Sequence, residues 1–225
     1  MFFAEGSINV LDFIRNTGLT VEIFASRNWI ENHTRDIASK TVIEVSEKEM
    51  VKLTALKSPS EVLAIFNLPD MKLPETIIED NLVLVTDDIK DPGNLGTIIR
   101  TADWFGVKNI ICSAETVDAF NPKVVQATMG SLARVNVSYG NLTDWLEGVE
   151  GNNIYGAVLN GENIKSIDKS NKSILIIGSE AHGISNEVLK YVNFPLTIPR
   201  SGSGGAESLN AAVAASILLY SFSAQ

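Results

Sequence analysis

The second half of the chain alternates short apolar runs with segments of helical periodicity, and this alternation restricts the fold more than any other feature. The run Leu82-Val83-Leu84-Val85 contains no polar residue, as is typical of a parallel strand buried on both faces. Further strands are expected at residues 109–112, 135–138, 154–159, 173–177 and 194–198. Helices are expected at residues 95–105, 122–129, 142–147, 186–192 and 207–222. The pattern predicts an open, mostly parallel α/β sheet, in which ligands bind beyond the carboxyl ends of the strands.

The first part of the chain, residues 1–68, predicts a smaller α/β unit. Helices are expected at residues 7–16 and 28–38, and strands at residues 20–25, 41–45 and 61–68. Ser46-Glu47-Lys48-Glu49 matches a capping box, which opens a further helix. Residues 69–80 contain two prolines among acidic residues and are interpreted as the linker to a second domain, residues 81–225. An ordinary surface loop is the alternative for the linker.

The composition is that of an ordinary globular protein, with 45% hydrophobic and 20% charged residues. The single cysteine, Cys112, excludes an intrachain disulfide, and with only His33 and His182 no zinc or other metal site is expected. Residues 211–220 are apolar but fall short of the ~20 residues that cross a bilayer. Without a recognisable signal peptide, a cytoplasmic protein with no membrane partner is expected.

The net charge of −9 argues against a protein that coats nucleic acid nonspecifically, because phosphate binding depends on lysine and arginine. It leaves room for an enzyme with one local basic surface. Charge therefore restricts the kind of nucleic-acid contact without excluding it.

Three segments that follow predicted strands carry the residues best suited to chemistry. In the first, residues 86–102, a polar loop leads into a helix with Asn94 and Arg100. An arginine on such a helix can fork onto a phosphate or a ribose. The alternative is a surface arginine paired with Asp103 or another acid.

In the second segment, residues 176–185, a buried strand ends at Gly178 and a loop with Glu180 follows. Ser185 can cap the next helix. Glu180 is suited to bind a hydroxyl or a cationic partner, and an exposed turn is the alternative. His182 is interpreted as a solvated loop residue rather than a catalyst.

The third segment, residues 198–210, is a glycine-rich loop before an alanine-rich helix that must be buried. Ser208 and Asn210 lie near the start of that helix, where donors for a polar or anionic group are available. Neither a P-loop nor a Gly-x-Gly-x-x-Gly fingerprint occurs, which argues against a nucleotide hydrolase or a dehydrogenase.

Together and in this order, the three segments resemble the SpoU (TrmH-like) family of RNA ribose methyltransferases in the SPOUT class. The family's three motifs are matched by Asn94, Gly96, Arg100, Thr101, Ala102 and Gly106, then Gly178, Ser179, Glu180, Gly183 and Ser185, then Ile198, Pro199, Ser208, Leu209 and Asn210. The first part resembles an L30e-like substrate-binding domain, though it starts short, through Ala4-Glu5-Gly6, the helix at Ser46, Ser58-Pro59 and Glu61-Val62-Leu63-Ala64.

The resemblance implies an α/β fold with a C-terminal trefoil knot and a homodimer in which catalytic groups of one subunit lie near the cofactor of the other. It implies methyl transfer from S-adenosylmethionine to a ribose 2′-hydroxyl of structured RNA, either ribosomal RNA or tRNA, with 23S ribosomal RNA preferred. The implied cofactor contacts are Leu159, Asn160, Gly161, Ile177, Gly178, Ile198, Ser208 and Leu209.

The same resemblance assigns roles in catalysis. Arg100 is the candidate to assist loss of the hydroxyl proton, or to orient the ribose through a phosphate. The residues expected to position Arg100 and the substrate are Asn94, Glu180, Ser208 and Asn210. Arg200 stands where the family often has methionine, in a loop a residue or two longer than usual, and there adds positive charge towards RNA.

Two other functions remain alternatives at this stage. One is a noncatalytic RNA-binding module that retains the fold, against which the intact set of Asn94, Arg100, Glu180 and Asn210 argues. The other is a SPOUT enzyme that methylates a base instead of the ribose. Cofactor binding tests the first alternative, and mass spectrometry of the modified nucleoside tests the second.

Overall fold

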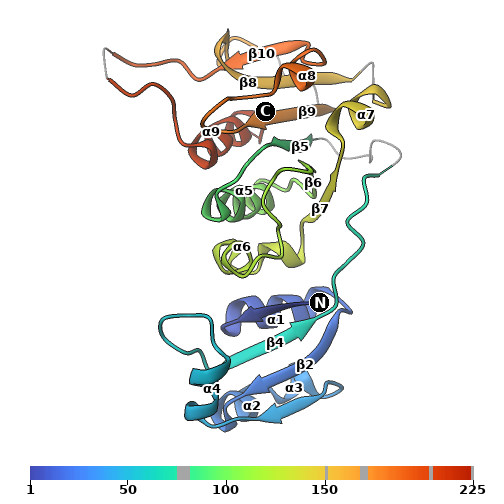
Figure 1. The fold of residues 1–225 in the computed structure, drawn as a ribbon, viewed down its shortest axis with the longest axis vertical. Coiled ribbons are helices and arrows are strands. Elements are labelled where there is room, and N and C mark those ends of the chain that lie inside the picture. Colours follow the sequence, from blue (N-terminus) through green and yellow to red (C-terminus); the bar gives the residue numbers. More distant parts are fainter. Residues whose placement is uncertain (75–81, 150–151, 168–171, 203–204, 224–225) are drawn as a thin grey trace.

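The computed structural model describes residues 1–74, 82–149, 152–167, 172–202 and 205–223. Within these ranges the strands form two separate sheets, one four-stranded and one six-stranded (Figure 1). The first sheet is built from residues 2–66 and the second from residues 82–197. The predicted α/β class is confirmed by both.

The four-stranded sheet has the strand order β1-β4-β2-β3. Strands β1 and β2 run antiparallel to β4, and β3 is parallel to β2. The strands are β1 (Phe2–Glu5), β2 (Thr20–Ala25), β3 (Val42–Glu44) and β4 (Val62–Phe66). The helices are α1 (Ser7–Asn16), α2 (Arg27–Asn32), α3 (Thr34–Ile37) and α4 (Glu47–Leu53). The rings of Phe2, Phe13 and Phe66 lie in its core with centroids 5.0–5.4 Å apart, Phe2 stacked on Phe66 and edge-on to Phe13.

Two features of this first unit differ from the sequence predictions. The helix predicted at residues 28–38 is split into α2 and α3, because His33 adopts a non-helical backbone with φ −125° and ψ 23°. Strand β1 was not predicted, since four residues are too few for a clear alternation. The capping box at Ser46 and Glu49 is confirmed, with both reciprocal hydrogen bonds present.

The six-stranded sheet has the order β10-β8-β9-β5-β6-β7 with all neighbours parallel, which confirms the predicted parallel sheet. Its strands are β5 (Leu82–Asp87), β6 (Asn109–Ser113), β7 (Asn136–Gly140), β8 (Asn153–Asn163), β9 (Ser173–Gly178) and β10 (Phe194–Thr197). The helices are α5 (Pro92–Trp104), α6 (Pro122–Thr128), α7 (Leu142–Glu147), α8 (Asn186–Leu189) and α9 (Ala211–Ser223), with a 3-10 turn η1 (Ser131–Ala133). Helices α5, α6 and α9 pack on one face and α7 and α8 on the other (Figure 1).

The strand order reverses between β5 and β9. From β5 the chain builds β6 and β7 on one side, whereas β9, β8 and β10 lie on the other. The last residues of the two central strands, Asp87 and Gly178, are register partners. Loops leaving two such strands diverge and open a crevice, so this edge is where a ligand is expected.

The last helix begins later than predicted. The sequence suggested a helix from residue 207, but α9 starts at Ala211. Asn210 caps it instead, since its Oδ1 accepts hydrogen bonds from the backbone NH groups of Ala212 and Val213 at 3.0 and 3.3 Å. Residues 207–210 are therefore not part of the helix.

The segment that connects the two sheets lies alongside β7. The NH of Tyr139 donates to the carbonyl of Met71 at 2.8 Å, and Trp145 Nε1 donates to the carbonyl of Pro74 at 3.1 Å. Residues 75–80 of the predicted linker lie outside the described residues. The described residues of the predicted linker are thus bound to β7 and α7 of the second unit.

The two units also touch directly. Phe2 of β1 and Phe120, just before α6, place their ring centroids 4.6 Å apart. Arg134 Nη1 lies 2.8 Å from Asp12 Oδ2 of α1. No helix in the described part of the chain is long and apolar enough to cross a membrane.

Candidate functional site

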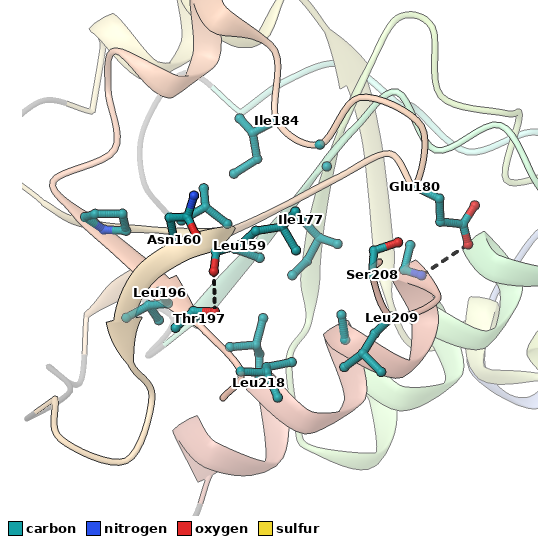
Figure 2. Close-up of a pocket in the computed structure, with 18 of the residues that line it drawn as sticks. Leu159, Asn160, Ile177, Glu180, Ile184, Leu196, Thr197, Ser208, Leu209 and Leu218 are labelled. Atoms are coloured by element: carbon teal, nitrogen blue, oxygen red, sulfur yellow. Dashed lines mark hydrogen bonds between the residues drawn. The ribbon is translucent and has the colours of Figure 1, made fainter. Parts of the chain in front are cut away.

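A cavity of about 1,100 Å³ opens at the carboxyl ends of β8, β9 and β10 (Figure 2). Its apolar floor includes Ile177, Leu196 and Leu218. Figure 2 places Glu180 and Ser208 towards one end of the cavity and Leu159 and Asn160 towards the other. The cavity therefore lies at the carboxyl edge of the sheet, on the β9 side of the point where the strand order reverses, and no residue of β5 lines it.

The first wall comes from β8 and β10. Thr197 Oγ1 donates a hydrogen bond to the carbonyl of Leu159 at 2.9 Å and ties the two strands together at the cavity (Figure 2). Leu159 and Asn160, which were predicted to contact the cofactor, line the cavity. Gly161 differs, because it is not among the lining residues and packs on β10, where a Cβ atom would lie 2.6 Å from the Pro195 carbonyl oxygen.

The second wall is a tight hairpin, residues 179–183. Ser179 and Gly183 exchange two backbone hydrogen bonds of 3.1 and 2.9 Å. The returning strand lies directly against Gly178, where a Cβ atom would stand 2.1 Å from the Gly183 carbonyl carbon. Only glycine fits at 178. This close contact lets the hairpin carry Glu180 to the cavity while Ile184 closes its side.

The third wall is residues 195–202 together with 206–209 and one face of α9. The predicted cofactor residues Ile198, Ser208 and Leu209 line it. Arg200 also lines it, and its guanidinium donates to the backbone carbonyl of Glu207. This bond closes the glycine-rich loop at its base.

Glu180 joins all three motifs through one oxygen. Its Oε1 accepts hydrogen bonds from Asn94 Nδ2 at 2.6 Å, Asn210 Nδ2 at 2.8 Å and the NH of Ala211 at 3.1 Å. Asn210 Nδ2 also donates to Asn94 Oδ1 at 2.9 Å. We call Asn94, Glu180 and Asn210 the Glu180 network. It brings together residues from α5, the 179–183 hairpin and the start of α9.

Arg100 stands apart from this network. It lies on the exposed face of α5, six residues and so about 9 Å along the helix from Asn94. Asp103, the partner considered from the sequence, instead pairs with Arg134 at 2.8 Å. Within the described residues Arg100 has neither an ion pair nor a hydrogen bond. Its guanidinium is therefore available to a ligand.

Sequence reasoning missed the part of the cavity that α9 supplies. The lining residues Ala211, Ala214, Ile217 and Leu218 follow one face of the helix. Their spacing of three, then three, then one residue is the helical signal that would have found them. His182 also lines the cavity, on the exposed turn of the hairpin. The described residues contain no group of three or more His, Cys, Asp or Glu placed to hold a metal ion.

A family model described as the SpoU rRNA Methylase family matches residues 81–220. The chain belongs to this family. Among SpoU methylases, the chain is 34% identical to the 23S rRNA (guanosine(2553)-2'-O)-methyltransferase RlmP of Bacillus subtilis, over 97% of this chain and 87% of that protein. It is 31% identical to the 23S rRNA (uridine(2479)-2'-O)-methyltransferase of Streptomyces viridochromogenes, over 82% of this chain and 64% of that protein.

Solved structures of RNA methyltransferases have a similar fold. A putative RNA methyltransferase of the TrmH family from Porphyromonas gingivalis superposes with a TM-score of 0.87 at 34% identity, over 98% of this chain and 88% of that one. An AdoMet-bound rRNA methyltransferase from Sinorhizobium meliloti superposes with a TM-score of 0.86 at 30% identity, over 98% and 86%. The prediction of an S-adenosylmethionine-dependent RNA 2′-O-methyltransferase is confirmed at the level of the family.

Proposed function

We propose that this SpoU methylase transfers a methyl group to a ribose 2′-hydroxyl of 23S ribosomal RNA, with Glu180, Asn94 and Asn210 as the frame of its active site. The observation that carries the proposal is the Glu180 network, which gathers the three motifs beside the cavity. Names of the relatives support the choice of RNA, since two of them act on 23S rRNA.

The cavity has the chemistry that S-adenosylmethionine requires. Ile177, Leu196 and Leu218 offer an apolar floor to an uncharged ring system. Asn160 and Ser208 place polar groups near its two ends (Figure 2). When bound, S-adenosylmethionine supplies a methyl group already activated by its sulfonium. Backbone groups of Leu159, Ile177, Gly178, Ile198 and Leu209 are the proposed contacts, which leaves the lining side chains to exclude water.

Arg100 is the proposed catalytic residue. Arginine stays protonated at neutral pH, so its role is to donate hydrogen bonds to the ribose oxygen or the adjoining phosphate. A guanidinium at that oxygen favours transfer of the hydroxyl proton to solvent water, because it stabilises the negative charge that develops on the oxygen. Glu180 is proposed as a positioning group and not as the base, because its Oε1 already accepts three hydrogen bonds.

Arg100 does not line the cavity of its own subunit. In a homodimer, it could instead act at the cavity of the other subunit. Its exposed neighbour one turn on, Trp104, leaves 84% of its surface accessible. On the adjoining helix α9, Val213 and Tyr220 are 47% and 63% exposed. An apolar face of this kind marks a protein interface. We propose that a second copy covers the face formed by Trp104, Val213 and Tyr220, so that Arg100 reaches the cavity of the partner.

The remaining parts of the proposal concern the domains. Residues 1–68 serve as an L30e-like RNA-binding domain, residues 69–80 as the linker and residues 81–225 as the catalytic domain with a C-terminal trefoil knot. The backbone supports the knot in one respect. The chain pairs β10 with β8 at the sheet edge and then returns to bond Ala211 to Glu180, next to the central strand β9. A cytoplasmic location stays a prediction.

The test has two stages. Calorimetry with S-adenosylmethionine and its demethylated product is expected to give about one saturable site per subunit. Incubation with unmodified ribosomal RNA and tRNA, followed by mass spectrometry of nucleosides, is expected to yield a 2′-O-methylnucleoside from 23S rRNA. A folded sample that binds neither ligand would support the noncatalytic module, and a methylated base would support the base-modifying alternative.

A further inference from the structure

A buried acid lies behind the proposed active site and has no part in the roles assigned so far. Asp87 is the last residue of the central strand β5 and is 5% exposed. It belongs to none of the residues that line the cavity. Burying a carboxylate is costly unless it is hydrogen bonded, so its partner indicates its purpose.

The partner is the hairpin that carries Glu180. Asp87 Oδ2 accepts a hydrogen bond of 2.7 Å from the backbone NH of Ser185. Ser185 lies two residues after the end of the 179–183 hairpin and immediately before α8. The bond therefore crosses from β5 to the exit of the loop that leaves β9.

The two ends of this hairpin are held in different ways. Its entry is held by the sheet, because Gly178 is the register partner of Asp87. Its exit is held by the contact of Gly183 with Gly178 and by the Asp87–Ser185 bond. Of these restraints, the Asp87 bond is the one that a side chain supplies and that substitution can remove.

The same strand positions the other half of the network. The loop after Asp87 leads within four residues to Asp91, whose carboxylate caps α5 by accepting from the NH of Asn94 at 2.8 Å. The positions of both Asn94 and Glu180 therefore depend on the end of β5. A shift of the hairpin relative to β5 lengthens that bond directly.

We propose that Asp87 is a positioning residue of the methyl-transfer site, which fixes the Glu180 hairpin to β5 through the NH of Ser185. The inference rests on the proposed function and goes beyond it, because it adds a residue outside the three motifs. Misplacement of a catalytic frame by about 1 Å can lower the rate about 100-fold. The carboxylate acts as an acceptor, so an amide oxygen at the same place can replace it.

The experiment uses the full-length protein and removes the bond from either side. Asp87→Leu deletes the acceptor and keeps the branching at Cγ, with two methyl groups in place of the carboxylate oxygens. Ser185→Pro deletes the donor, and the φ of −60° at this position suits proline. Asp87→Asn keeps an acceptor. Asp88→Asn is the matched control, since Asp88 pairs with Lys90 at the surface and asparagine tolerates its φ of 60°.

For each variant, kcat at saturating cofactor and amide hydrogen exchange at residues 179–184 are measured. Asp87→Leu and Ser185→Pro are each expected to lower kcat on the order of 10- to 100-fold and to speed exchange in the hairpin. Asp87→Asn is expected to stay within about 3-fold of wild type. The double variant is expected to be no worse than either single variant, because both remove one bond.

The outcomes separate the inference from the proposed function. Wild-type protein that neither binds cofactor nor methylates RNA counts against the proposed function. Active wild type with unchanged kcat in Ser185→Pro overturns the inference alone. An Asp87→Asn variant as impaired as Asp87→Leu also overturns it, as do effects of the two single variants that simply add. If Asp87→Leu does not fold, Ser185→Pro and Asp87→Asn decide the matter.

Discussion

Asn94 and Asn210 lie 116 residues apart in the chain and share a hydrogen bond of 2.9 Å, from Asn210 Nδ2 to Asn94 Oδ1. Asn94 is in the first turn of α5, and Asn210 caps α9. Both side chains also donate to Glu180, so two helix N-termini face one carboxylate. Helix N-termini favour negative charge, which makes Glu180 the group that holds the two helices in register.

Removing that carboxylate is the first prediction. Glu180→Ala leaves the amides of Asn94 and Asn210 and the NH of Ala211 without their common acceptor. We expect kcat/KM for RNA to fall on the order of 100-fold, measured under single-turnover conditions. Glu180→Gln keeps Oε1 as an acceptor and is expected to lose about 10-fold.

Glu187→Ala is the control for loss of a negative charge near the cavity. Glu187 is exposed in the first turn of α8, two residues after the hairpin exit at Ser185. It is expected to keep wild-type activity. Equal losses in Glu187→Ala and Glu180→Ala would mean that overall charge, and not the network, controls the rate.

Arg100→Ala is expected to abolish turnover and to leave the dissociation constant for S-adenosylmethionine within about 3-fold of wild type, because its proposed contacts are to the ribose or phosphate of the RNA and not to the cofactor. Calorimetry and nucleoside mass spectrometry measure the two effects separately. Lys108→Ala removes an exposed positive charge eight residues further along the chain and is expected to be active. Near-normal turnover of Arg100→Ala would show that its assigned role is wrong.

Whether Arg100 acts across the dimer can be tested by mixing subunits. A heterodimer of Arg100→Ala and Glu180→Ala subunits contains one site with both residues only if Arg100 serves the partner. We expect the mixture to recover activity, up to about half that of wild type per heterodimer. Mixed dimers that stay as inactive as the two parents would place Arg100 in its own subunit's site.

Local signals in the sequence predicted the presence of helices and strands better than the residues at which they begin and end. The Ser46–Glu49 capping box lies within four consecutive residues and was correctly predicted, whereas the break at His33 has no Gly or Pro to mark it. Helix α9 was predicted to begin four residues early, because Asn210 reads equally well as a helix residue or as its cap. Boundaries of this kind depend on tertiary contacts.

The candidate site divides in the same way. The motifs identified Asn94, Glu180 and Asn210 individually. These residues are 86, 30 and 116 positions apart in the sequence, and only the order of the strands brings them into contact. Gly161, which was expected to contact the cofactor, is not among the lining residues and packs on β10, so that contact stays a prediction. Asp87 gave no signal in the sequence, because an acid at a strand end is commonly a solvated one.

The buried thiol of Cys112 gives a prediction about unfolding. Burial is the main cause that raises its pKa to about 12, with hydrogen bonds from Thr86 and Tyr139 acting the other way. Since the thiolate is the reactive form, a thiol reagent at pH 8 is expected to label no cysteine in the native protein and one per chain in 6 M guanidinium chloride. Fast labelling under native conditions would mean that β6 opens.

The contact between the two units gives the last prediction. Arg134 bridges Asp12 of α1 and Asp103 of α5, with closest distances of 2.8 Å to each. Asp12 also packs on Gly130, where a Cβ atom would lie 2.1 Å from its Oδ2. Arg134→Met keeps an unbranched apolar stem, without the guanidinium, and removes both pairs. Because the pairs are partly exposed and screened, we expect a loss of about 1 kcal/mol in the free energy of unfolding.

The pH dependence follows from Asp103. Burial acts to raise its pKa, but hydrogen bonds from Arg134 and Ser131 outweigh this, so the pKa is lowered. A carboxyl with a lowered pKa in the folded state adds stability above its unfolded value of ~3.9, and this is lost as the pH falls through the folded value. The difference between wild type and Arg134→Met should therefore be constant from pH 8 to 5 and shrink below pH 4.

Arg15→Met is the matched control, because Arg15 pairs with Asp36 at 2.8 Å inside the first unit. Urea unfolding should show a similar small loss for both variants. Only Arg134→Met should loosen the first unit against the second, which small-angle scattering would detect as a larger radius of gyration, and raise the KM for RNA. If Arg15→Met raised the KM equally, the contact between the units would have no special part in presenting RNA to the catalytic site.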